Sequence, residues 1–152
     1  MRVVVGADEA LPVVDVVTAA VAALGHELVV VGPAAGGADE WADVAATAAR
    51  MVAVGDAGWG VVLCWSGTGV AIAANKIPGV RAALCTDAET ARLARKYNHA
   101  NVLALSMRLS SSAVADEIVR AFAGAAYGDE DFDTRNVARV DALDVSRPEG
   151  QN

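Results

Sequence analysis

The sequence contains few of the residues that mark secreted, metal-binding or membrane proteins. It has only two cysteines and two histidines, with neither a C-x-x-C pair nor another zinc-ligand spacing. We expect Cys64 and Cys85 to be buried free thiols, and we expect no metal site. No apolar run reaches the roughly 18–20 residues that a membrane span needs. Asp8, Glu9 and Asp15 interrupt the N-terminal segment, so we expect no secretory signal, no membrane contact and a cytoplasmic protein.

Basic residues are outnumbered, since 12 lysines and arginines stand against 19 aspartates and glutamates, for a net charge of −7. Such a protein is a poor general binder of nucleic acid, although a few converging arginines would still bind a small anion. Aromatic residues are also scarce, at 5%, and alanine and valine dominate the 55% of hydrophobic residues. This composition favours short, closely packed strands and helices in a chain of one-domain length.

Apolar strand patterns alternate with helical patterns along the chain. Strands are expected at residues 2–5, 27–31, 59–64, 80–85 and 101–105. Helices are expected at residues 13–24, 40–54, 69–75, 87–97, 112–123 and 134–145, with an acidic loop over 128–133. This alternation predicts a three-layer, doubly wound α/β fold of the Rossmann-like type, with a five-stranded parallel sheet. We expect one domain over residues 1–145 and a frayed tail over 146–152.

The loop Ser66-Gly67-Thr68-Gly69 follows the third expected strand, and ligands of doubly wound sheets bind beyond such strand ends. Its glycines let backbone N–H groups face a ligand, which suits a phosphate or a developing oxyanion at the start of a helix. A tight turn without a ligand would use the same residues. The spacing matches neither G-x-G-x-x-G nor the P-loop, which weakens a nucleotide-binding interpretation. Trp65 is expected to wall this pocket, whereas Trp41 and Trp59 are expected to be packing residues.

Charged side chains supply further candidates near the strand ends. Asp8 and Glu9 follow the first strand, where a carboxylate serves as a general base, as a ligand for sugar hydroxyls or simply as a helix cap. Arg108 follows the fifth strand. Arg135 and Arg139 lie four residues apart on one face of the last expected helix. They would hold a phosphate dianion, unless they form only a solvated basic edge.

Taken together, these segments resemble the family of ribose-5-phosphate isomerase B and galactose-6-phosphate isomerase. The resemblance extends to about residue 143 and is most specific over residues 67–82. It is supported by Asp8, Asn98, residues 101–105 with Arg108, and the pair Arg135 and Arg139. The resemblance implies a cofactor-free isomerase that interconverts aldose and ketose phosphates through a cis-enediolate. It also implies a homodimer or tetramer with the active site at a subunit interface.

The resemblance assigns a role to each matching residue. Asp8 would bind the sugar ring or help to open it, and the hydroxyl of Thr68 would lie near the ring oxygen. The backbone of the glycine loop would form the anion hole. The substrate-binding residues implied in this way are Gly67, Gly69, Asn98, Arg108, Arg135 and Arg139.

Several positions depart from the family pattern. Glu9 and Tyr97 stand where many members have a histidine, and Ser66 stands where many have a catalytic cysteine. Members with serine use a glutamate at the position that Val70 occupies here. The side chain of Val70 cannot move a proton. Because an unactivated serine is a poor base, Asp8 or Glu9 would have to supply the base. The catalytic candidates are therefore Asp8, Glu9, Ser66, Thr68 and Tyr97.

Two functions follow from the resemblance. The first is aldose–ketose isomerisation of a phosphorylated sugar of four to six carbons. The second is binding or sensing of such a sugar by a protein that has lost turnover. A nucleotide-binding Rossmann module is a third interpretation, weakened by the missing fingerprints.

Overall fold

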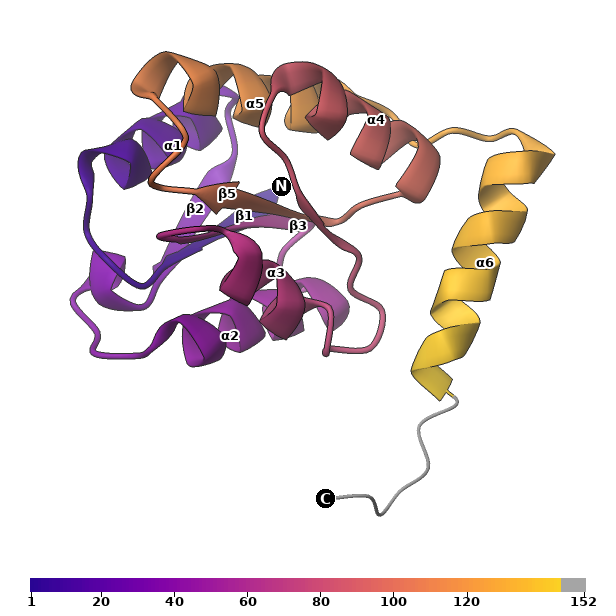
Figure 1. Ribbon diagram of the computed structural model, residues 1–152, viewed down its shortest axis with the longest axis horizontal. Helices are drawn as coiled ribbons and strands as arrows, with labels where there is room; N and C mark the ends of the chain where they lie inside the picture. The colour runs from indigo at the N-terminus through magenta and orange to yellow at the C-terminus, as the bar shows by residue number, and fades with distance from the viewer. Residues whose placement is uncertain (146–152) are drawn as a thin grey trace.

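The computed structural model describes residues 1–145, in which strands and helices alternate as the sequence predicts (Figure 1). The strands are β1 (Arg2–Ala7), β2 (Glu27–Val31), β3 (Trp59–Cys64), β4 (Ala82–Leu84) and β5 (Val102–Ser106). The helices are α1 (Pro12–Ala23), α2 (Trp41–Ala53), α3 (Thr68–Ala74), α4 (Ala88–Asn98), α5 (Ser112–Gly124) and α6 (Asp131–Val145), with a 3-10 turn at Pro33–Ala35. The tail expected over residues 146–152 lies outside the described residues.

The strands form one parallel sheet in the order β2-β1-β3-β5-β4. β1 is paired on both sides, with Val5 opposite Val30 of β2 and Val61 of β3. The chain therefore reverses its direction of winding beside β1. In such sheets a crevice opens at the carboxyl ends of the two strands that flank the reversal, here β1 and β3. The predicted five-stranded, doubly wound sheet is confirmed.

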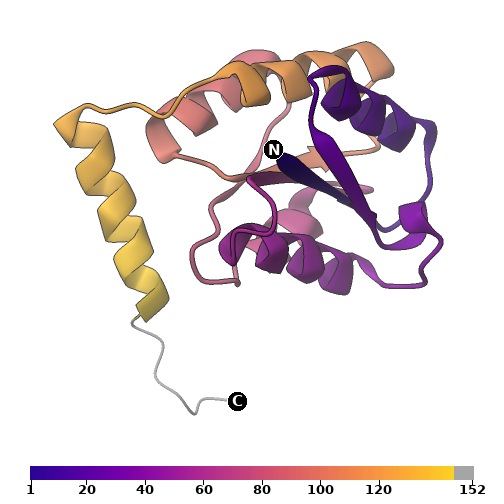
Figure 2. The ribbon, with the colours of Figure 1, turned by 180° about the vertical axis from the view of Figure 1, so that it is seen from behind.

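Helices cover both faces of the sheet (Figures 1 and 2). Successive strand residues point to opposite faces, so Val3 and Val5 pack with α1, α4 and α5, whereas Val4 packs with α2 and α3. Trp59 is buried against Phe122, with ring centroids 5.6 Å apart, as expected for a packing residue. The central strands β1, β3 and β5 thus bury side chains on both of their faces, as is typical of parallel sheets.

Both cysteines are free and buried, as the sequence predicts. Burial raises the pKa of the Cys85 thiol to about 11, and the nearby charge of Asp87 adds to this shift. Cys85 therefore stays protonated at neutral pH and behaves as a small apolar residue.

β4 is shorter than the strand predicted over residues 80–85. It lies at the edge of the sheet and pairs only with β5. Before it, the side chain of Asn75 accepts a hydrogen bond from the N–H of Ala82 and donates one to its carbonyl. Arg81 is held instead by Asn101, whose Oδ1 accepts from its N–H at 2.8 Å. Side-chain hydrogen bonds thus add to the backbone bonds that the Arg81 carbonyl accepts from Asn101 and Val102 at this end of the strand.

α6 begins at Asp131, three residues before the predicted start, so the acidic segment is only partly a loop. Asp131 and Asp133 in its first turn favour a helix N-terminus electrostatically. The helix stands apart from the two covering layers in both ribbon views (Figures 1 and 2). Arg81 bonds Asp141 of α6 at 2.7 Å, and the N–H of Gly79 donates to Asp144 at 2.7 Å. We call these two contacts the α6 clasp.

Candidate active site

The carboxyl ends of β1 and β3 border a cavity of about 290 Å³. Ala7 of β1 lies opposite Leu63 of β3, so the residues that follow them project from the same edge of the sheet. The cavity is lined by Asp8, Trp41, Cys64, Trp65, Ser66, Thr68 and Gly69. The predicted crevice therefore brings the carboxylate after β1 together with the glycine loop after β3.

Gly67 gives the loop its sharp turn, because its φ of 76° lies in the left-handed region that favours glycine. A Cβ there would also lie 2.6 Å from Cδ1 of Leu84 and 2.8 Å from the backbone carbon of Leu105. The turn leads directly into α3, whose first N–H groups have no partner one turn earlier in the helix. α3 is only seven residues long, so these local amides, rather than a long helix dipole, would face an anion.

Two hydroxyls meet inside the loop. The Oγ of Ser66 and the Oγ1 of Thr68 lie 2.7 Å apart, and the Thr68 N–H points weakly to the same Oγ at 3.4 Å. This pair orients hydrogen-bond donors and acceptors toward the cavity. A hydroxyl bonded to another hydroxyl is not activated as a base, because neither partner draws its proton away near neutral pH.

Asp8 is the charged side chain that lines the cavity. Its Oδ1 is buried and accepts no hydrogen bond from residues 1–145. Burial raises the pKa of the Asp8 carboxyl above its usual range, and the charge of Glu9 raises it further. Both effects destabilise the charged form and bring the pKa of the carboxyl closer to the neutral pH at which general bases work best. Glu9 itself is exposed and is not among the cavity-lining residues.

Arg108 lies at the same edge of the sheet. Its backbone N–H donates to the carbonyl of Trp65 at 3.0 Å, which joins the end of β5 to the glycine loop. The Oγ of Ser106 donates to the same carbonyl at 2.9 Å. The side chain of Arg108 is exposed, so a guanidinium stands beside the cavity and is free to meet a phosphate.

Tyr97 and Asn98 lie elsewhere, at the end of α4. α4 starts near the carboxyl edge of the sheet, and its eleven residues carry it about 16 Å toward the other edge. His99, at φ 48°, ends the helix in the left-handed region. Tyr97 and Asn98 line a second cavity of about 330 Å³, which shares no lining residue with the first.

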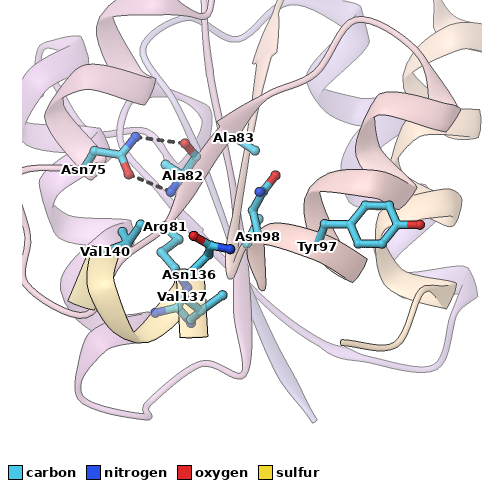
Figure 3. Close-up of a pocket in the computed structure, with 10 residues that line it drawn as sticks. Asn75, Arg81, Ala82, Ala83, Tyr97, Asn98, Asn136, Val137 and Val140 are labelled. Carbon is cyan, nitrogen blue, oxygen red and sulfur yellow. Dashed lines mark hydrogen bonds between the residues drawn. The ribbon is translucent and has the colours of Figure 1, made fainter. Parts of the chain in front are cut away.

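α6 forms the outer wall of this second cavity (Figure 3). Asn136, Val137 and Val140 line it, and Asp141 lies on the same side of α6 in the clasp. Positions 135 and 139 fall on the opposite face, at 100° per residue. Arg135 and Arg139 are accordingly exposed, and no hydrogen bond or ion pair holds either one within residues 1–145. They point away from their own sheet.

The structure thus separates the predicted site residues into two groups. Asp8, Ser66, Thr68 and Gly69 share one cavity. Tyr97 and Asn98 line the other, and the two α6 arginines face outward.

Sequence reasoning missed three cavity residues. Trp41 was expected to be only a packing residue, which is wrong: it is 44% exposed and lines the first cavity, as does Cys64. Its place directly after Glu40 at the start of α2 was the available signal, since helices that follow parallel strands begin at the carboxyl edge. Asn136 lines the second cavity beside Tyr97, and nothing in its local sequence indicates this.

Within residues 1–145, no group of three or more histidine, cysteine or acidic side chains could hold a metal ion. No helix in the same part of the chain combines the length and apolarity needed to span a bilayer.

Comparison with known proteins gives consistent matches. The ribose/galactose isomerase family matches residues 3–143. The galactose-6-phosphate isomerase subunit LacB of Clostridium acetobutylicum is 38% identical over 104 residues, covering 68% of this chain and 60% of the relative. Ribose-5-phosphate isomerase B of Escherichia coli is 41% identical over 83 residues, covering 55% and 56%. The chain therefore matches less than two thirds of the length of these curated relatives.

Solved structures match over more of their length. Type B ribose 5-phosphate isomerase of Trypanosoma brucei is 39% identical, with a TM-score of 0.87 over 93% of this chain and 97% of that one. The enzyme of Trypanosoma cruzi is 34% identical, with a TM-score of 0.90 over 97% and 100%.

Proposed function

Because the chain belongs to the ribose/galactose isomerase family, we propose that it interconverts the aldose and ketose forms of a phosphorylated sugar through an enediolate. The observation that carries this proposal is the first cavity. There a partly buried carboxylate with a raised pKa, Asp8, lies across from the amides and hydroxyls of the loop 66–69. Proton transfer next to a carbonyl needs both parts, a base for the carbon-bound proton and donors for the oxyanion.

Asp8 acts as the base in this proposal. Its carboxylate removes the proton from C2 of the open-chain aldose, and the electron pair of that bond forms the C1=C2 double bond of the enediolate. The charge that develops on O1 faces the loop of Gly67 and Gly69. The proton then returns to C1 while the proton on O2 passes to O1, which yields the ketose. Ser66 and Thr68 orient the oxygens during this exchange.

The neighbouring positions support Asp8 as the base. Val70, at the place where serine-containing relatives use an acid, is fully buried and carries no proton. Cys64 lines the cavity, but its side chain is almost entirely buried. Glu9 is exposed outside the cavity lining and acts on Asp8 through its charge. Asp8 is therefore the acid–base side chain that lines the cavity.

The phosphate end of the site requires a second copy of the chain. Arg108 stands beside the cavity, whereas Arg135 and Arg139 point away from their own sheet. In a homodimer or a tetramer of dimers, the outer face of α6 in one copy would bring these two guanidiniums to the first cavity of the other copy, and the end of α4 would supply Tyr97 and Asn98. Two guanidiniums on one helix face match the geometry of a phosphate dianion. The site would then lie at the subunit interface.

Isomerisation is tested by incubation with ribose 5-phosphate, allose 6-phosphate or tetrulose 4-phosphate in D₂O. Solvent deuterium should enter C1 of the ketose or C2 of the aldose. Binding of these sugars without exchange of any carbon-bound proton would contradict the isomerase and support a sensing protein. Absence of both binding and exchange would contradict every sugar-phosphate function.

A further inference from the structure

Two partly exposed indoles face the first cavity. Trp41 is 44% exposed and Trp65 is 56% exposed, whereas the third tryptophan, Trp59, is buried at 2%. Large aromatic side chains usually bury most of their surface in a core or an interface. Two of them, exposed on one small cavity, indicate a surface prepared for a ligand.

Trp41 is held in place by its contact with the backbone of Gly69. Its ring packs over Gly69 so closely that a Cβ at that position would lie 3.0 Å from Cε3 of the indole. The ring therefore rests on the backbone of the glycine loop, directly beside the amides that would face the enediolate. Trp41 comes from the start of α2, so its indole also joins the α2 layer to this loop.

Trp65 is held by its backbone instead. Its carbonyl accepts hydrogen bonds from the Oγ of Ser106 and from the N–H of Arg108. The carbonyl of its neighbour Cys64 accepts another from the N–H of Met107 at 3.0 Å. The main chain is thus fixed while the indole stays open to solvent, which suits a rigid platform for a ligand.

The lining of the cavity decides which part of a ligand this platform meets. Among the lining residues Asp8 alone is charged, so the phosphate lies outside, toward the arginines. The sugar carbons then lie between the hydroxyls of the loop and the indoles. C–H bonds next to oxygens carry partial positive charge, and the face of an aromatic ring is negative.

We propose that Trp41 and Trp65 form an aromatic clamp that recognises the ring-closed form of the sugar phosphate by stacking against its C–H face. A closed ring presents several C–H bonds on one flat side, whereas an open chain does not. The clamp therefore binds the cyclic substrate before ring opening and loses contact as the chain extends toward the loop. This inference rests on the proposed isomerase function and adds the substrate form that the site selects.

The test compares two probes that cannot be isomerised, the ring-locked 1,5-anhydroglucitol 6-phosphate and the open-chain glucitol 6-phosphate. Binding is measured by calorimetry, and tryptophan fluorescence reports contact with the indoles. Trp65→Ala should raise the Kd of the ring-locked probe about five- to tenfold and leave that of the open-chain probe unchanged. Trp65→Phe should restore most of the affinity. Leu109→Ala, which removes an exposed apolar side chain outside the cavity lining, serves as the matched control.

Equal weakening of both probes, no weakening of either, or failure of the unmodified protein to bind the ring-locked probe would overturn the clamp. Failure of the proposed isomerase would show differently, as binding of the ring-locked probe without deuterium exchange into any aldose phosphate.

Discussion

Asp8 affects the stability of the fold as well as carrying the proposed catalytic role. Its pKa in the folded protein lies above the value of the unfolded chain, chiefly because of burial. Folding therefore favours the protonated form, and this contribution is complete below about pH 3.8 and is lost as the pH rises through the folded pKa. The native protein at neutral pH carries a carboxylate that its surroundings disfavour, which is typical of a catalytic group.

Asp8→Asn should therefore stabilise the protein at pH 7 while removing activity. The asparagine amide has the shape of the neutral acid. The melting temperature of the variant should therefore exceed that of the unmodified protein at pH 7, and the difference should vanish below about pH 4. Deuterium exchange should fall roughly 10²–10⁴-fold. Thermal melts across this pH range check the first effect. Asp56→Asn, an exposed change far from the cavity, corrects for lost charge, and equal pH dependence in both variants would contradict the assignment.

The effect of close packing at Gly67 can be measured by comparison with Gly55, which also has a positive φ but has no neighbouring atoms where a Cβ would lie. Gly67→Ala introduces both a left-handed alanine and a clash with Leu84 and Leu105, so it should cost about 2–4 kcal/mol. Gly55→Ala has φ 82° with nothing within 4 Å, so it should cost only the backbone strain, about 1–2 kcal/mol. Urea unfolding of the two variants measures the difference. Equal losses would mean that close packing at Gly67 contributes nothing.

At the scale of elements, α6 is attached through the α6 clasp. The side chain of Arg81 is largely buried, at 18% exposed, whereas that of Asp141 is 48% exposed. Asp144 accepts a hydrogen bond from the N–H of Gly79. The double variant Asp141→Asn with Asp144→Asn should leave global stability within about 1–2 kcal/mol. Amide hydrogen exchange in residues 131–145 should become faster, because the clasp joins this helix to the segment that precedes β4. Unchanged exchange there would show that contacts other than the clasp hold α6.

The sequence predicts elements well where one residue pattern decides them. Central strands such as β3 read as continuous apolar runs because both faces are buried, and Asp87 accepts from the N–H of Thr90 as the cap of α4. The edge strand β4 was predicted too long. At its start the N–H groups of Ala82 and Arg81 donate to the side chains of Asn75 and Asn101, and the local residue pattern does not reveal these contacts. The start of α6 was predicted too late, because acidic residues are common both in the first turn of a helix and in loops.

The site could be predicted only where chain order places residues at one edge. The residues after β1 and β3 meet because parallel strands end together, so Asp8 and the loop 66–69 were identified correctly as neighbours. The helical periodicity put Arg135 and Arg139 on one face but carried no information on where that face points. Its direction depends on the α6 clasp, which joins residues 60 and 65 positions apart.

At the scale of the whole molecule, the separation of the two residue groups has a direct consequence for assembly. One chain holds Asp8 and the glycine loop in one cavity, while its α6 arginines face outward. In a symmetric dimer, each site would take its base from one copy and its phosphate-binding arginines from the other. Variants in the two groups should then complement each other across subunits.

Asp8→Asn and Arg139→Ala should each be nearly inactive as pure proteins and partly active when co-expressed in equal amounts. Random assembly makes about half of the dimers mixed, and one of the two sites in a mixed dimer carries neither substitution, so activity should recover to about a quarter of the unmodified level. A matched mixture of Asp8→Asn with Asp8→Ala should not recover, because every site in every dimer then lacks the Asp8 carboxyl. If each chain held a complete site of its own, neither mixture would recover, and the guanidinium of Arg139 would have to reach the loop 66–69 within one copy.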